Sequence, residues 1–360
     1  GSDSTNALAS GGEAPAVTAV TELWNGTNWT EQNDLNTARY GAGGGGTNTA
    51  TLVFGGYASD FSAATEEWNV GVPIGVWATG GTLNTARDQV FGGAGTQTAA
   101  LLAGGSPPPA GATVTESYNG SNWTEVNDLS TGRRALAMSG ATNTASLAFG
   151  GFAPPGDLAV TETWNGTNWT EVNDLTTARS FLSGFGTSTA SIAFGGESPG
   201  VSFEAITEFW NGTNWTEVND LNTARRNAAG NGITTSGLAY SGQIPPGTST
   251  DTESWNGTNW TEVNNMNAGR QGLVGVGSAG NTAALAIGGE TSPGADQAST
   301  EEWNGASWVE VADLSTARAY LGGAGTTTAG IVMGGNTGSV SAATEEWSGS
   351  SNTTKTVSTD

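Results

Sequence analysis

Seven arginines recur along the chain at intervals of 45 to 48 residues, and each stands just before a run of small residues. The planar guanidinium of arginine binds carboxylate or phosphate in two-point fashion. Seven equivalent copies therefore predict either a ring that contacts an acidic ligand or a set of internal pairs with an equally regular Glu, such as Glu162 or Glu208. The equal spacing of both residues favours the internal pairs. The recurring arginines are Arg39, Arg87, Arg133, Arg179, Arg225, Arg270 and Arg318, and Arg134 and Arg226 add charge beside two of them.

The composition excludes several other kinds of chemistry. The chain has no His and no Cys, so neither a Ser-His-Asp triad nor a thiol nucleophile can form, and its single lysine is Lys355. We expect no cofactor and no metal site. The formal net charge of −23 argues against nucleic acid and anionic membranes, because both are bound mainly through cationic contacts.

Two further polar patterns have a simpler interpretation. Acids such as Glu171 and Asp174 could hold Ca²⁺, but they stand three apart in an extended segment and so point to opposite faces. We expect a solvated outer edge there. The paired N-x-T triplets of the N-G-T-N-W-T phrase resemble glycosylation sites, but the Asn-Gly step is typical of a tight turn.

A 46-residue repeat positions all of these residues. After each Arg comes a Gly-rich stretch (strand A, as in 181–186), then an apolar run stopped by two glycines (strand B, 189–196). The segment T-E-x-W follows (strand C), and W-T-E-V-N-D-L returns after the turn (strand D). Four antiparallel strands per repeat are typical of a propeller blade. The sequence predicts an all-β fold, a seven-bladed β-propeller of four-stranded antiparallel blades.

The 14 tryptophans all occupy one of two positions in this repeat, the end of strand C or the start of strand D. Trp24 and Trp29, for example, flank the turn symmetrically and should face one another. We expect such pairs to fill the space between blades. A sugar-binding aromatic shelf is the functional alternative.

The combination R-x-G, G-G, E-x-W and W-T-E-V resembles the kelch repeat over almost the whole chain, from Thr5 to Gly349. The resemblance implies a propeller that serves as a binding platform. It departs from the family in a tighter turn between strands C and D and in blade one, where Val72-Pro73-Ile74 stand in the strand D region.

The strand count leaves two ways to close the ring. The N-terminus supplies B, C and D strands (5–12, 20–24 and 29–35), and the C-terminus supplies A, B and C (318–325, 328–335 and 344–347). Either C-terminal A, B and C take strand D from the N-terminus, or C-terminal A alone joins N-terminal B, C and D. In both, strands from both termini close the ring, and we expect the first. One domain would cover residues 1–349, with blades beginning near each recurring Arg and a polar tail at 350–360. The surplus B and C hairpin could add a strand to another molecule.

The loops between strands B and C vary most among the repeats, and loops on a rigid scaffold commonly carry binding specificity. Aromatic candidates in them are Tyr57, Phe61, Phe152 and Phe203. We therefore expect a non-enzymatic binding or structural protein with a glycan or protein as its partner. Its polar composition suggests an extracellular location or a virion surface, as in a phage appendage. The alternative is a hydrolase or lyase that uses two carboxylates at the mouth of the channel.

Overall fold

The computed structural model describes residues 7–13, 16–24, 28–31, 35, 38–46, 50–54, 57–59, 65–69, 75–106, 112–200, 202–277, 280–291 and 294–349. The chain divides into two compact units. One comprises Gly1–Ile74 with Ser350–Asp360, and the other comprises Gly75–Gly349. No helix in the described ranges is long and apolar enough to cross a bilayer.

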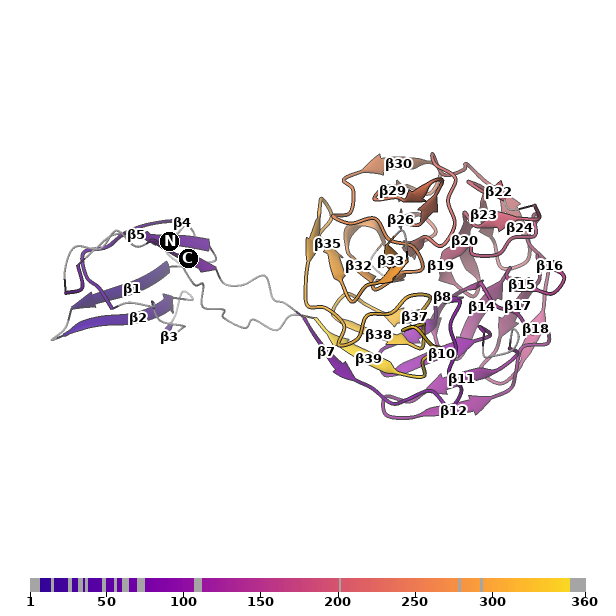
Figure 1. The fold of residues 1–360 in the computed structure, drawn as a ribbon, viewed down its shortest axis with the longest axis horizontal. Coiled ribbons are helices and arrows are strands. Elements are labelled where there is room, and N and C mark those ends of the chain that lie inside the picture. The colour runs from indigo at the N-terminus through magenta and orange to yellow at the C-terminus, as the bar shows by residue number, and fades with distance from the viewer. Residues whose placement is uncertain are drawn as a thin grey trace. The chain divides into compact units, whose positions relative to one another are not determined.

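The larger unit is an all-β propeller of six blades arranged around a central axis (Figure 1). In each blade strand A lies nearest the axis, next to the A strands of its neighbours, and strand D lies outermost. The strands of the first three blades, in the order A to D, are β9 (Ala94–Thr96), β10 (Ala99–Ala103), β11 (Thr115–Tyr118) and β12 (Trp123–Val126); β13 (Leu136–Thr142), β14 (Ala145–Phe149), β17 (Thr161–Trp164) and β18 (Trp169–Glu171); and β19 (Ser183–Thr187), β20 (Ala190–Phe194), β23 (Thr207–Trp210) and β24 (Trp215–Glu217).

The other three blades follow the same order. They are β25 (Ala229–Ile233), β26 (Ser236–Tyr240), β29 (Thr252–Trp255) and β30 (Trp260–Val263); β31 (Val274–Val276), β32 (Ala284–Ile287), β35 (Thr300–Trp303) and β36 (Trp308–Glu310); and β37 (Gly322–Gly325), β38 (Ala329–Met333), β39 (Thr344–Ser348) and β7 (Val76–Thr79). The second blade has a fifth strand, because β8 (Val90–Phe91) pairs in parallel with β13. A short 3₁₀ helix, η1 (Gly280–Thr282), precedes β32.

The predicted number of seven blades is wrong, and the ring closes with six. The closing strand D is β7, which pairs antiparallel with β39 so that Trp77 lies opposite Trp347. The chain therefore closes the ring with the strand just before Arg87, and the repeat that begins near Arg39 stays outside it. The expected closure by residues 29–35 is wrong, because β7 supplies the strand D that pairs with β39.

Strand A of the first repeat differs from its counterparts in side-chain content. In five of the six ring blades a buried Val or Leu stands three residues after the Arg, as Leu136 and Leu182 do. The first repeat has Ala42 there, and its strand consists of Gly43–Gly46. Such a strand has no side chains to pack against a neighbouring blade, which is consistent with its place outside the ring.

The smaller unit contains two three-stranded sheets. One is formed by β1 (Ala7–Glu13), β2 (Val17–Trp24) and β3 (Trp29–Glu31), and the other by β4 (Gly43–Gly46), β5 (Ala50–Phe54) and β6 (Thr65–Asn69). The first sheet corresponds to strands B, C and D of a blade and the second to A, B and C. The surplus hairpin of the sequence is thus β1 and β2, paired with β3. The tail 350–360 lies outside the described residues.

Tryptophans connect each blade to the one before it, as predicted. The strand D indole Nε1 donates to the threonine that begins strand C of the preceding blade, a polar contact inside an apolar interface. The six bonds, at 3.0 to 3.3 Å, are Trp123 to Thr344, Trp169 to Thr115, Trp215 to Thr161, Trp260 to Thr207, Trp308 to Thr252 and Trp77 to Thr300. The bond from Trp77 completes the circle and fixes β7 as a ring strand.

Glycines in strand A allow the blades to approach closely. A Cβ at Gly184 would lie 2.6 Å from the ring of Phe149, and one at Gly230 would lie 2.5 Å from Phe194. Both aromatic residues belong to strand B of the preceding blade. The Gly-rich inner strands therefore leave the space that large side chains from the neighbouring blade fill.

Closure by β7 can be tested with a disulfide, because the chain has no native cysteine. Val76 and Ser348 are directly opposite in the β39–β7 pair. The double variant Val76→Cys and Ser348→Cys should therefore oxidise to a disulfide, which shifts mobility on a non-reducing gel. In the loop-entropy description this disulfide raises the free energy of unfolding by up to about 5 kcal/mol.

The control pairs Ser348→Cys with Asn28→Cys. Asn28 precedes Trp29 as Val76 precedes Trp77, so this pair reports closure through residues 29–35. It should stay reduced, and its oxidation in place of the first pair would contradict the six-bladed ring.

Candidate functional site

The recurring arginines of the ring are buried and form ion pairs with the strand C glutamates of their own blades. This confirms the internal pairing, one of the two interpretations open from the sequence, and it places these guanidinium groups beyond the reach of a ligand at the channel mouth. Arg39 is likewise buried, in the smaller unit. The ring pairs are Arg87–Glu116 (2.5 Å), Arg133–Glu162 (2.6 Å), Arg179–Glu208 (2.8 Å), Arg225–Glu253 (2.5 Å), Arg270–Glu301 (2.9 Å) and Arg318–Glu345.

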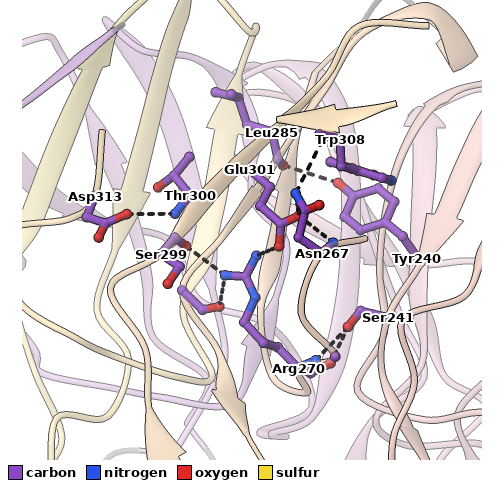
Figure 2. Close-up of polar contacts among 12 residues, drawn as sticks. Tyr240, Ser241, Asn267, Arg270, Leu285, Ser299, Thr300, Glu301, Trp308 and Asp313 are labelled. Carbon is purple, nitrogen blue, oxygen red and sulfur yellow. Dashed lines mark hydrogen bonds and ion pairs between the residues drawn. The ribbon is translucent and has the colours of Figure 1, made fainter. Parts of the chain in front are cut away.

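Figure 2 shows how one such pair holds three segments together. Arg270 Nη1 donates to the carbonyl oxygens of Gly288 (2.8 Å) and Ser299 (2.6 Å), while Nη2 meets Glu301. The other oxygen of Glu301 accepts from the backbone N–H of Asn267 at 2.8 Å. Asn267 lies in the segment between strand D of one blade and strand A of the next, so the pair fixes that segment.

Burial lowers the pKa of most of these arginines, and the paired glutamate opposes the shift. Because an arginine pKa starts far above neutrality, the groups stay charged. A buried ion pair is tolerated only where each charge is well bonded, and here every pair also binds backbone groups.

Other repeated polar residues also support the scaffold. Asp174 Oδ1 accepts from the backbone N–H of Thr161 at 3.1 Å, and Asn173 Nδ2 donates to Asn214 Oδ1 of the next blade at 2.7 Å. In the N-G-T-N turn, Asn165 Oδ1 accepts from the backbone N–H groups of Thr167 and Asn168. The N-x-T triplets thus form turns, as predicted. The sequence did not predict that the Asp after strand D accepts a hydrogen bond from the backbone of strand C.

A closed circle of backbone hydrogen bonds surrounds the axis at the end where strand A begins. In each blade the residue two after the Arg has positive φ, and its N–H donates to the carbonyl oxygen of the equivalent residue in the preceding blade at 2.6 to 3.0 Å. Sequence reasoning missed this circle because it involves only backbone atoms. Its members are Gln89, Ala135, Phe181, Asn227, Gly272 and Tyr320.

Side chains that differ from blade to blade gather around this circle. The residue after each Arg forms a β-bridge with the residue after the paired glycines of the same blade, for example Arg134 with Phe152. Both positions therefore lie at the same end of the channel as the B–C loops. We call the following set the mouth surface: Arg134, Phe152, Phe181, Glu197, Phe203, Arg226, Gln243, Gln271, Glu290 and Tyr320.

Arg226 is the centre of the best-defined cluster on the mouth surface. Its Cζ lies 4.8 Å from the ring centroid of Phe203 and 5.4 Å from that of Phe181. Nε donates to Gln243 Oε1 at 2.7 Å, and Nη1 forms an ion pair with Glu197. The Arg226 side chain is still 23% exposed, so in contrast to Arg225 it can meet a ligand.

A second cluster lies around Glu290, whose Oε1 accepts from the Tyr320 hydroxyl at 2.6 Å and from Gln271 Nε2 at 2.7 Å. Burial and then Glu290 raise the pKa of Tyr320. Burial also raises the pKa of Asp296, with Glu290 adding to the shift, because the two carboxylates stand opposite in the hairpin of β33 (Glu290–Thr291) and β34 (Ala295–Asp296).

The predicted loop aromatics divide between the two units. Phe152 and Phe203 belong to the mouth surface, and Arg134 Cζ lies 5.2 Å from the Phe152 ring centroid. Tyr57 lies in the smaller unit, where its ring centroid is 5.5 Å from that of Tyr40. Phe61 lies outside the described residues.

No family model matches the chain, and no curated protein matches it. The resemblance to the kelch repeat therefore stays a prediction, and the arguments about function depend on the geometry.

Arg225 belongs to the scaffold and its neighbour Arg226 belongs to the mouth surface, so substitutions of these two residues test the two roles. Arg225→Ala leaves Glu253 buried without its partner and should lower the free energy of unfolding by about 3–5 kcal/mol. Arg226→Ala removes a partly exposed pair and should cost less than about 1 kcal/mol. Urea denaturation measures both, and equal losses would refute this division of roles.

Asp88 offers a pH-dependent test at the same end of the ring. It is buried and accepts from Asn336 Nδ2 at 3.1 Å, and burial raises its pKa, with Asn336 and Arg134 opposing the shift. Ionised Asp88 is thus less favourable in the folded chain than in the unfolded chain, and the stability present at low pH is lost as pH rises through the raised pKa.

Asp88→Asn should therefore raise the melting temperature at pH 7, and this gain should disappear near pH 3. Asp174→Asn is the control, because the chain already has Asn265 at the equivalent position of the fourth blade. A gain for Asp88→Asn that is the same at both pH values would contradict the assignment.

Proposed function

We propose that this chain is a non-enzymatic binding propeller that recognises a glycan on the mouth surface. The observation that carries the proposal is the Arg226 cluster. It combines two aromatic rings, a guanidinium, a carboxylate and an amide in one partly exposed place.

This mixture of groups suits a sugar. An aromatic face packs against the C–H face of a pyranose ring, and charged or amide side chains hydrogen-bond its hydroxyl groups. The chain's net charge of −23 disfavours a polyanionic ligand through long-range repulsion. A neutral glycan avoids this repulsion.

The contrast between repeated and varied positions supports a binding role at this end. The Arg, Glu and Trp that recur in the ring, and the Asp that recurs in four of its blades, have internal partners, so the scaffold explains their repetition. The side chain after each Arg has no partner that repeats from blade to blade, and across the six blades the residue is Asp88, Arg134, Ser180, Arg226, Gln271 and Ala319. Varied side chains on a rigid support are typical of a recognition surface.

A glycan array followed by calorimetric titration tests the proposal. Arg226→Ala and Phe203→Ala should each weaken binding of the best glycan by about tenfold, the loss expected for a contact of this kind. Thr235→Ala is the matched control, because exposed Thr235 lies in the same blade at the other end of strand A. It should leave the affinity unchanged.

Two results would overturn the proposal: no glycan binds, or the mouth variants bind as the parent does. A protein ligand that loses affinity in the same variants would keep the mouth surface but replace the glycan.

The neighbouring carboxylates Glu290 and Asp296 favour one second candidate, a glycan hydrolase or lyase. Such an enzyme needs two carboxyl groups with different proton affinities. Glu290 already accepts two hydrogen bonds within the protein, which leaves it less free to react. Cleavage of an oligosaccharide during the titrations would support this candidate over simple binding.

A further inference from the structure

One tryptophan of the smaller unit is far more exposed than its counterparts in the ring. Trp29 begins strand D of the β1–β3 sheet and is 47% exposed. A large indole in water marks a surface that contacts another surface. The corresponding tryptophans of five ring blades are only 5–8% exposed, and they are Trp123, Trp169, Trp215, Trp260 and Trp308.

The β1–β3 sheet itself has the geometry of a ring blade. Trp24 lies directly opposite Trp29, with ring centroids 5.5 Å apart and planes inclined by 43°. In the second ring blade, Trp164 and Trp169 are opposite in the same way, at 5.4 Å and 43°. The difference in exposure therefore comes from the neighbouring blade that covers the indole in the ring. We call the side of the β1–β3 sheet that carries Trp24 and Trp29 the Trp29 face.

The ring shows what covers such an indole. The strand D tryptophan of each blade packs against the preceding blade, and its Nε1 donates to the threonine that begins strand C there. Each of the six ring threonines already accepts one indole, so the ring has no place left for Trp29.

The β4–β6 sheet has the sequence of such a place. Its strand C, β6, begins at Thr65, and residues 62–68 have the same sequence as residues 341–347. In that second copy of the sequence, Thr344 accepts from Trp123 Nε1 at 3.2 Å. Thr65 thus stands at the register position that accepts a strand D tryptophan.

The chain connection puts the β4–β6 sheet on the other side of the β1–β3 sheet. The Gly12 N–H donates to the Arg39 carbonyl oxygen at 2.8 Å, as the Gly151 N–H donates to the Arg179 carbonyl oxygen in the ring. The segment after β3 therefore runs as it does between two ring blades, and the β4–β6 sheet follows the β1–β3 sheet. A strand D tryptophan contacts the blade that precedes its own, so the Trp29 face is directed away from the β4–β6 sheet of the same chain.

We infer that the Trp29 face of one copy of this chain packs on the β4–β6 sheet of a second copy, where the Trp29 indole N–H donates to Thr65. The two surfaces differ, so the contact is head-to-tail and can add further copies until the assembly closes. It involves no residue of the mouth surface and does not depend on the proposed function.

Sedimentation equilibrium of the full chain tests the inference. The average mass of the parent should rise with concentration. Trp29→Ala should weaken the association at least about thirtyfold, the loss typical of a tryptophan at the centre of an interface. Ile233→Ala is the matched control, because Ile233 is also 47% exposed but lies in the ring. It should associate as the parent does.

Two further variants separate the contact from the folding of the sheet. Trp29→Phe keeps an aromatic ring beside Trp24 but loses the N–H donor, and it should weaken the association about fivefold or more. Thr65→Arg places a long charged side chain on the receiving surface and should also prevent association, although its Trp29 face is intact.

Mixing the variants tests the head-to-tail arrangement. Trp29→Ala keeps the receiving surface and Thr65→Arg keeps the Trp29 face, so an equimolar mixture should form a dimer and nothing larger. A dimer of Thr65→Arg alone would show that two Trp29 faces meet each other and would contradict the inference.

Three other results would overturn the inference. The parent stays monomeric at every concentration, both Trp29 variants associate as the parent does, or the mixture of Trp29→Ala and Thr65→Arg stays monomeric.

Discussion

The buried ion pair between the Arg before strand A and the Glu of strand C supports the rest of this propeller. Each pair joins three parts of the chain: the segment that leaves the preceding blade, the end of strand B and the start of strand C. Charges removed from water are tolerated only where other groups also bond them, and carbonyl and N–H groups bond the Arg270 Nη1 atom and the Glu301 carboxylate. The segment between blades, which carries the varied side chains, is therefore held in place.

The scaffold and the recognition surface use adjacent residues for different purposes. Arg225 is enclosed by its own blade, whereas Arg226 lies between two aromatic rings and reaches solvent. The tryptophans, like Arg225, belong to the scaffold, because their indole N–H groups connect the blades in a circle. Interactions of the repeated residues thus stabilise the ring without involving the mouth surface, and the side chains there are free to differ.

Much of this architecture could be predicted from the sequence, because the repeat marks the strands, the facing tryptophans and the Arg–Glu pairs directly. The number of blades could not. Residues 62–68 and 341–347 have the same sequence, S-A-A-T-E-E-W, so strands β6 and β39 offer β7 almost the same edge. Local pattern cannot decide between two such edges. The Arg226 cluster was predicted only in part: Arg226 and Phe203 were candidates, but Phe181, Glu197 and Gln243 join them through folding.

The circle of backbone hydrogen bonds has a consequence for the symmetry of the molecule. All six bonds point the same way around the axis, and each residue both gives and receives one, so the loop has no terminus. Bonds in such a loop polarise one another. One residue from each of the six blades forms this circle, and an extra blade would add a seventh residue and require different backbone angles. The closed circle of the innermost residues is therefore a geometric constraint on the number of blades in the ring.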